Sequence, residues 1–172
     1  MREIKIFDPQ NYDPTWPVYK RDSARGIIFV EGKLVLVKSK KYGEYKFPGG
    51  GIKAGERHED TLLRETMEEA GMVIVPDTIK PYGKTIVRHK SNQRPQEIFE
   101  QVSFYYTCDI DPGGTTSPSP EAGYEVEYGY APVLATLADA INANRKLLGI
   151  PEIPWVVRDL AVMEELASLE KI

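Results

Sequence analysis

The sequence contains very little cysteine and histidine: one Cys, Cys108, and two His among 172 residues. A single thiol cannot form an intrachain disulfide, so nothing in the sequence indicates an oxidising compartment. The first 20 residues hold three prolines and two aspartates but no apolar segment of the kind found in signal peptides. No stretch approaches the roughly 18 consecutive apolar residues of a membrane span. We therefore expect a cytoplasmic protein without a membrane partner.

The sequence also lacks an excess of positive charge. It has 22 Lys+Arg and 26 Asp+Glu, a formal net charge of -4. This balance argues against a partner such as duplex nucleic acid, which binds through a broad basic face. A small anionic substrate remains compatible if positive charge is supplied locally. The composition, 41% hydrophobic and 28% charged, is typical of a globular chain, and we expect one domain over residues 1–172.

Hydrophobic patterning predicts the elements of this domain. An extended lead-in covers about residues 1–22 and is expected to pack on the rest. Strands are predicted at 24–30, 33–38, 72–75, 84–88, 98–108 and 124–134. Those at 84–88 and 98–108 flank a polar tip at 91–96, so they are expected to form a long hairpin. A loop is predicted at 109–123. Helices are predicted at 57–70, where Gly71 would end the helix, and near the end of the chain at about 137–148 and 154–169. Strands with one early and two late helices indicate an α/β or α+β layered domain.

The first predicted helix carries a cluster of acidic residues. Glu65, Glu68 and Glu69 stand at i, i+3 and i+4, so their carboxylates share one patch of the helix surface. A solvated acidic face is the plain interpretation, and a site for Mg²⁺ or Mn²⁺ is the alternative, because hard cations prefer oxygen ligands. The helix periodicity predicts a different arc that faces the core, formed by Leu63, Thr66, Met67 and Ala70.

A glycine-rich segment precedes this helix, and it is not a Walker A loop. Gly50 and Gly55 have the required spacing, but Glu56 stands where that loop needs a lysine. This substitution argues against a P-loop NTPase. Glycines beside a carboxylate-bearing helix indicate instead a tight turn that brings a backbone carbonyl close to a cation.

The region from Gly50 to Met72 resembles the Nudix box, G-x5-E-x7-R-E-U-x-E-E-x-G-U, in which U is a bulky aliphatic residue. Gly50, Glu56 and the run from Arg64 to Met72 match it in spacing, and Thr66 is the single departure. The surrounding strands extend the resemblance over about residues 24–134. It implies the Nudix fold, a mixed β-sheet sandwiched between helices.

The resemblance also implies an activity. Nudix hydrolases cleave a nucleoside diphosphate linked to another group, X, by attack of a metal-activated water on phosphorus. Arg64 would pair with Glu56 and thereby hold Glu65 in register, and one of the box glutamates would serve as the base. Mg²⁺, with Mn²⁺ as the alternative, would be bound by four ligands: Glu65, Glu68, Glu69 and the carbonyl oxygen of Gly49.

Other candidates lie outside the box. Glu125 and Glu127 are candidates for an additional ligand or base, with Glu100 behind them, and a solvent-facing strand position is the alternative for each. Candidates for substrate binding are the cationic residues Arg25, Lys46, Arg88 and Lys90 and the aromatic residues Tyr42, Tyr45 and Phe47. Core packing is the more common use of a residue such as Phe47.

The expected substrate is a nucleoside triphosphate or a small nucleotide conjugate. Ile86 stands where ADP-ribose hydrolases tend to carry a proline, which argues against that subclass. Two alternatives are a catalytically silent Nudix-fold domain that senses nucleotides and a purely structural domain. The apolar C-terminal helices are explained by packing on the same domain, with a homodimer interface as the alternative.

Overall fold

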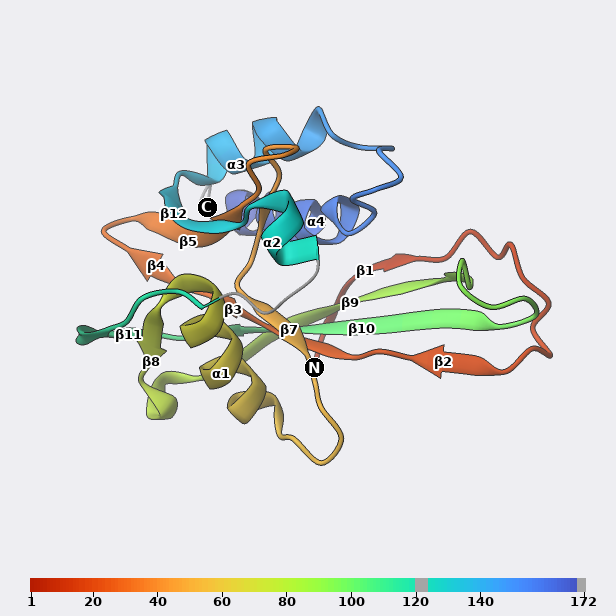
Figure 1. Ribbon diagram of the computed structural model, residues 1–172, viewed down its shortest axis with the longest axis horizontal. Helices are drawn as coiled ribbons and strands as arrows, with labels where there is room; N and C mark the ends of the chain where they lie inside the picture. The colour runs from red at the N-terminus through yellow and green to blue at the C-terminus, as the bar shows by residue number, and fades with distance from the viewer. Residues whose placement is uncertain (120–123, 170–172) are drawn as a thin grey trace.

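The computed structural model describes residues 1–119 and 124–169, which form a mixed β-sheet with helices on both sides (Figure 1). Six strands make the main sheet, in the order β1-β9-β10-β3-β7 with β2 also paired to β10. Their bounds are β1 Glu3–Phe7, β2 Val18–Lys20, β3 Ser23–Ile27, β7 Gly49–Gly51, β9 Lys80–Lys90 and β10 Ile98–Thr107. Strands β9 and β10 form the long antiparallel hairpin that the sequence predicts, while β2 and β3 run parallel to β10.

Two smaller sheets complete the β-structure. One joins β4 Phe29–Val30, β5 Lys33–Lys38, β6 Tyr45–Lys46 and β12 Ala131–Ala135, and the other pairs β8 Met72–Ile74 with β11 Ile110–Thr115. The helices are α1 His58–Ala70, α2 Tyr124–Tyr128, α3 Leu137–Arg145 and α4 Val156–Leu169, with a 3₁₀ turn at Pro76–Thr78. In Figure 1, α1 lies on one side of the main sheet, and α3 and α4 lie on the other. The predicted α+β class and Nudix-type layering are confirmed.

The lead-in is part of the sheet. Strand β1 pairs in parallel with β9 over Glu3 to Phe7, and β2 pairs with β10 at Ile98 to Glu100. This segment contacts the rest of the chain through backbone pairing and through Ile4, which packs against the core. None of the helices within residues 1–119 and 124–169 is long and apolar enough to cross a bilayer.

Three predicted elements differ from the structure. The strand predicted at 24–30 is divided into β3 and β4, which belong to different sheets. The loop predicted at 109–123 contains β11, whose backbone pairs with β8 despite Gly113 and Gly114; residues 120–123 lie outside the described part. The strand predicted at 124–134 begins as helix α2, and only 131–135 is strand. A hydrophobicity pattern over only five residues, the length of α2, cannot distinguish a helical turn from a strand. Gly129 follows α2 in the left-handed conformation, at a φ of 65°, and ends the helix.

Helix α1 begins at His58 and ends at Ala70, with Gly71 in the left-handed conformation as predicted. Its buried face is rotated from the predicted one. Thr66 and Ala70 are buried as expected, but Met67 is 42% exposed, and Leu62 and Glu69 are buried instead. The prediction for Met67 is therefore wrong. A hydrophobicity pattern places charged residues outside, and it could not anticipate that Glu69 finds polar partners in the interior.

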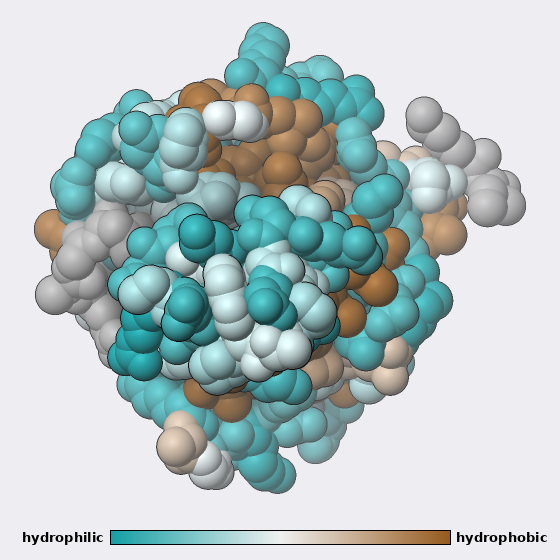
Figure 2. Space-filling model, turned by 90° about the vertical axis from the view of Figure 1, so that its right-hand side faces the viewer, coloured by the Kyte–Doolittle hydropathy of each residue, from teal (hydrophilic) through white to brown (hydrophobic). Residues whose placement is uncertain are grey.

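The C-terminal helices bury their apolar residues against their own chain. Val156, Leu160, Val162, Met163 and Leu166 are all at most 8% exposed, and most of them belong to the cluster that also holds Ile27, Phe47 and Tyr105. Viewed along the hairpin, apolar side chains also gather on the surface above the polar hairpin end (Figure 2). Packing on the same chain accounts for the apolar sequence of α4, whereas the homodimer stays a prediction.

Candidate active site

Arg64 is the hub of the polar cluster on α1. Its Nε and Nη2 atoms donate to the two carboxylate oxygens of Glu56, at 2.9 and 3.0 Å. Its Nη1 atom donates to Glu65 at 2.6 Å and to Glu68 at 3.3 Å. A guanidinium group has donors in a planar fork, so one side chain can fix three carboxylates. The structure thus brings together four of the predicted site residues.

Glu56 also anchors the loop before α1. Its Oε2 atom accepts hydrogen bonds from the backbone N–H of Lys53 at 3.0 Å and from the hydroxyl of Thr61 at 2.7 Å. The hydrogen bonds from Arg64, followed by those from Lys53 and Thr61, outweigh partial burial and lower the pKa of Glu56 to about 2. The Glu56 carboxylate is therefore ionised in the folded protein near neutral pH.

The glycine strand β7 lies directly against the Glu65 carboxylate. A Cβ atom built on Gly50 would stand 2.4 Å from the Cδ atom of Glu65, closer than real Cβ contacts allow. Only glycine permits this approach, because it has no side chain. Burial raises the pKa of Glu65, and the hydrogen bond and charge of Arg64 oppose this rise. A carboxylate with a raised pKa beside a cavity is a candidate for catalysis.

Glu69 is buried and is held from two sides. Lys46 donates to its Oε1 atom at 3.0 Å, and the backbone N–H of Gly49 donates to its Oε2 atom at 2.9 Å. Both side chains of the ion pair are at most 5% exposed. Arg25, also buried, donates from one nitrogen to the carbonyl oxygens of Phe47 and Gly49, each at 3.1 Å. These bonds tie the glycine strand to α1 and to β3.

The donor atoms of this region suit a hard divalent cation. They are carboxylate oxygens of α1 and carbonyl oxygens of β7, the ligand type that Mg²⁺ and Mn²⁺ prefer. Glu65 Oε2 and Glu68 Oε1 accept no hydrogen bond from any described residue, so both atoms remain for a cation. Within the described part of the chain, no three acidic, histidine or cysteine side chains already form a cation-binding group. The residues fit the ion in chemistry, and the hydrogen bonds of Arg64 and Lys46 currently balance their charge.

A cavity of about 340 Å³ opens beside these carboxylates. Its walls near the box come from Glu65, the glycine strand and three cations, Arg21, Arg25 and Lys46. This volume lies in the range of small-molecule sites, which run from about 300 to 1,000 Å³. The cations provide the local positive charge that an anionic substrate needs in a protein of net charge -4.

The candidates outside the box are distributed differently. Glu125, on α2, lines the cavity together with Glu65. Glu127 is 63% exposed and pairs with Lys41 at 2.6 Å. Glu100 pairs with Lys20 at 3.2 Å and with Arg88 at 3.4 Å. Because side chains alternate along a strand, Glu100 lies on the sheet face opposite that of its cavity-lining neighbours on β10.

The predicted substrate-binding residues also divide. Arg25 and Lys46 line the cavity, but Phe47 is fully buried and packs edge-on against Tyr105, with ring centroids 5.6 Å apart. Arg88 stacks over Tyr12 and belongs to the Glu100 cluster. The other three lie elsewhere: Lys90 beside Trp16, Tyr42 against Tyr128, and Tyr45 buried in the core.

Several cavity residues escaped the sequence analysis. They are Arg21, Val87, His89, Phe99, Gln101, Pro154, Trp155 and Arg158. A period of two along the predicted hairpin would place Phe99 and Gln101 on one face, opposite His89 and Val87 in register. No local signal connects these residues to Trp155 and Arg158, which come from the start of α4.

Comparisons with known proteins agree with this geometry. The sequence model of the NUDIX domain matches residues 20–148. An uncharacterized Nudix hydrolase, YvcI, from Bacillus subtilis (strain 168) is 25% identical over 95 residues, which cover 55% of this chain and 58% of that protein. The chain thus matches less than two thirds of that relative's length.

Solved structures show the same fold at low identity. A NUDIX hydrolase from Nitrosomonas europaea superposes with a TM-score of 0.50 at 17% identity, over 82% of this chain and 88% of the other. A mutator MutT protein from Bacillus halodurans superposes with a TM-score of 0.52 at 18% identity, over 72% of each chain. Members of this family generally use divalent metal ions and act on small nucleotides. With its complete box and the match over residues 20–148, the chain belongs to the Nudix family of hydrolases.

Proposed function

We propose that this protein is a divalent-metal-dependent pyrophosphohydrolase that cleaves the diphosphate linkage of a nucleoside diphosphate joined to X. A nucleoside triphosphate or a small nucleotide conjugate is the proposed substrate class. The observation that carries the proposal is the Arg64 hub, which holds Glu56 and Glu68 together with Glu65, a residue that lines a cavity with three cations.

The proposed metal ligands are Glu65, Glu68, Glu69 and the Gly49 carbonyl oxygen, with Mg²⁺ as the ion and Mn²⁺ as the alternative. When bound, a divalent ion neutralises pyrophosphate oxygens and lowers the pKa of a bound water. Arg64 positions the carboxylates, and Glu56 in turn holds Arg64. Glu125 lines the same cavity as Glu65 and is the preferred additional ligand or base, ahead of Glu127.

The chain's own cations have a separate role. Arg21, Arg25 and Lys46 lie along the cavity wall next to the glycine strand, so they would face the phosphates of a bound nucleotide. Lys46 already balances Glu69, and Arg25 holds the Gly49 carbonyl in place. We infer that these residues orient the polyphosphate and offset the negative charge that gathers when it binds beside the glutamates.

The test is the substitution Glu68→Gln, with Glu59→Gln in the first turn of the same helix as the matched control. Each removes one negative charge at nearly constant volume, but Glu59 lies outside the Arg64 hub. We expect Glu68→Gln to lower kcat by 100-fold or more, the order of loss when an electrostatic group of an active site is removed. Release of phosphate or pyrophosphate from a nucleotide panel with Mg²⁺ measures it, and Mn²⁺ binding followed by electron paramagnetic resonance should weaken in parallel.

The outcome that contradicts the proposal is turnover of Glu68→Gln equal to that of Glu59→Gln. Nucleotide binding without turnover by the unsubstituted protein across the whole panel would point to the sensing domain instead.

A further inference from the structure

The half of the cavity farther from the box is built by a different part of the chain. Trp155 and Arg158 come from the start of α4, beyond residues 20–148 that match the NUDIX domain. Phe99 and Gln101 face them from β10. This wall therefore combines residues of the matched family region with residues that lie beyond it.

Gln101 has a fixed orientation in this wall. Arg158 donates from Nη1 to its side-chain oxygen at 2.7 Å. A guanidinium group has no acceptor, so the amide atom that faces Arg158 must be the oxygen, and the two N–H groups of Gln101 point elsewhere. No acceptor within residues 1–119 and 124–169 takes these N–H groups. Gln101 thus offers its N–H donors to a molecule in the cavity, while its oxygen is held by Arg158.

A buried network keeps Arg158 in place. Its Nη2 atom donates to Asp159 at 3.2 Å, and the hydroxyl of Tyr105 donates to the other oxygen of Asp159 at 2.9 Å. Arg158 is 2% exposed, and Asp159 and Tyr105 are fully buried. Because each group is held by the next, Gln101 cannot turn over its amide without breaking a charge-assisted hydrogen bond.

Aromatic rings line the same half of the cavity. Trp155 is half-buried and lies 6.4 Å from the ring of Tyr128, at an interplanar angle of 31°. Phe99 lies 5.2 Å from the ring of His89, also at 31°. Flat heteroaromatic groups stack on such rings, and the rings accept any base because every base has a π-face.

The distance to the box suits one nucleotide unit. Gly51 of β7 pairs with Ser23 of β3, and Ser23 pairs with Ser103 of β10. Gln101 lies two residues before Ser103 on the same strand. Two strand spacings of about 4.8 Å and a rise of about 3.3 Å per residue place Gln101 about 12 Å from Gly51. A nucleotide whose phosphates lie beside Glu65 therefore extends its base to Gln101.

From these observations we infer that this half of the cavity is a nucleobase site that selects oxo bases. The site would bind guanine, hypoxanthine, uracil or thymine, whose carbonyl oxygen accepts from Gln101 at the position where adenine and cytosine carry an amino group. Trp155 and Phe99 supply the stacking surface. The inference rests on the proposed function, since it assigns the base of the same substrate.

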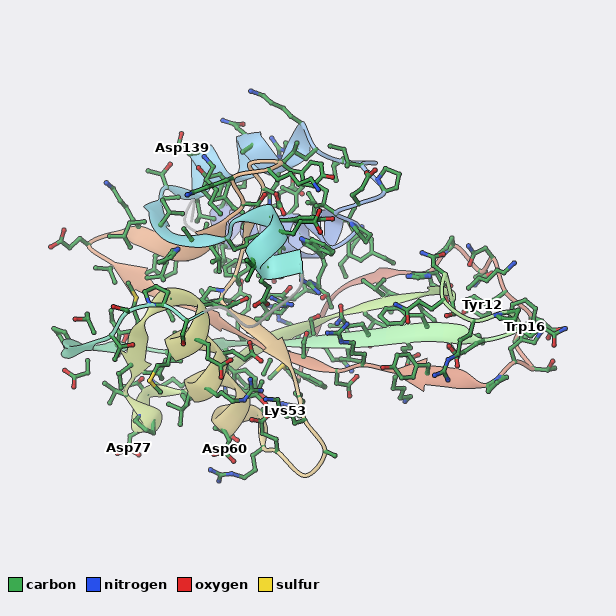
Figure 3. All side chains as sticks on the ribbon, viewed as in Figure 1. Tyr12, Trp16, Lys53, Asp60, Asp77 and Asp139 are labelled. Carbon is green, nitrogen blue, oxygen red and sulfur yellow. The ribbon has the colours of Figure 1, made fainter. Side chains whose placement is uncertain are left out.

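Binding can be measured apart from hydrolysis. The chain has two tryptophans, and Trp16 lies at the far end of the hairpin (Figure 3). In a Trp16→Phe protein, fluorescence quenching then reports on Trp155 alone. Titration with nucleoside monophosphates, which hold no diphosphate bond to cleave, should show inosine monophosphate binding about tenfold more tightly than adenosine monophosphate, the size of discrimination by one good base contact.

The decisive variant is Gln101→Glu in the Trp16→Phe background. A carboxylate at this position keeps its bond to Arg158 but offers the cavity an acceptor, so the preference should reverse toward adenosine monophosphate. Gln93→Glu on the exposed hairpin end is the control with the same charge change, and it should retain the inosine preference. Trp155→Phe should retain nucleotide binding, whereas Trp155→Ala should weaken the binding of every base. For these two variants, binding is measured by the Mg²⁺-dependent displacement of a fluorescent nucleotide.

The outcomes for the base site and for the hydrolase are distinct. Equal binding of the inosine and adenosine monophosphates, or an unchanged preference in Gln101→Glu, overturns the base site even if nucleotides are hydrolysed. Hydrolysis without any quenching of Trp155 overturns it too. An inosine preference that reverses in Gln101→Glu supports the base site even if no nucleotide in the panel is hydrolysed.

Discussion

Glu56 accepts four hydrogen bonds near the start of α1. Arg64 meets it with two parallel hydrogen bonds, and Lys53 and Thr61 supply two more from the loop and the first turn. The box motif predicts the pairing with Arg64. The other two donors depend on how the loop after the glycine strand folds back, which only the structure reveals.

The pKa of Glu56 yields a prediction for stability against pH. The pKa is lowered from 4.5 to about 2, so the unfolded chain binds this proton more readily than the folded chain. Glu56 therefore stabilises the fold fully above pH 4.5, and this contribution is lost as the pH falls from 4.5 toward 2. We expect Glu56→Gln to lower the free energy of unfolding at pH 7 and to lower it much less at pH 3, as measured by urea denaturation. An equal loss at both values would show that ionisation of Glu56 does not stabilise the fold.

At the scale of elements, α3 is attached to the short strand β6 through one side chain. Asn144 accepts from the backbone N–H of Tyr45 at 2.9 Å and donates to the carbonyl of the same residue at 2.8 Å. It thus completes the hydrogen bonding of β6 as a neighbouring strand would. Strand β7 begins at Gly49, three residues after β6 ends at Lys46, so this attachment also positions the glycine strand of the site.

The substitution Asn144→Ala tests this attachment. It leaves a buried N–H and a buried C=O of Tyr45 without partners, and each such group costs about 1–3 kcal/mol. We expect the free energy of unfolding to fall by about 2 kcal/mol or more. Asn142→Ala, at an exposed position of the same helix, should change it by less than about 0.5 kcal/mol. Equal effects of the two substitutions in thermal or urea unfolding would contradict the role of Asn144.

At the scale of the whole molecule, one hydrophobic cluster joins segments that are far apart in the sequence. It contains Ile27, Phe47 and Tyr105 from the region matched to the NUDIX domain, and Leu160 and Met163 from α4 outside it. The lead-in is joined through strand pairing and through Ile4, which packs against this cluster. We propose that residues 1–172 form one folding unit, in which α4 closes both the core and the cavity.

One folding unit predicts one unfolding transition. In the Trp16→Phe protein, Trp155 fluorescence follows the start of α4, whereas far-ultraviolet circular dichroism follows all elements. The two probes should give the same urea midpoint, because removing α4 alone would expose Met163 and its neighbours to water. A separate, earlier fluorescence transition would show that α4 detaches on its own.

The sequence by itself determined the box, the helix that carries it and its ending at Gly71, because these depend on spacings within one continuous segment of the chain. It also indicated the hairpin of β9 and β10. Only the tertiary structure decided that Glu69 turns inward to Lys46, that Arg158 binds Gln101 and that Trp155 lines the same cavity. Local patterns record which face of an element is apolar, but these polar contacts join residues 23 and 57 positions apart and leave no such period.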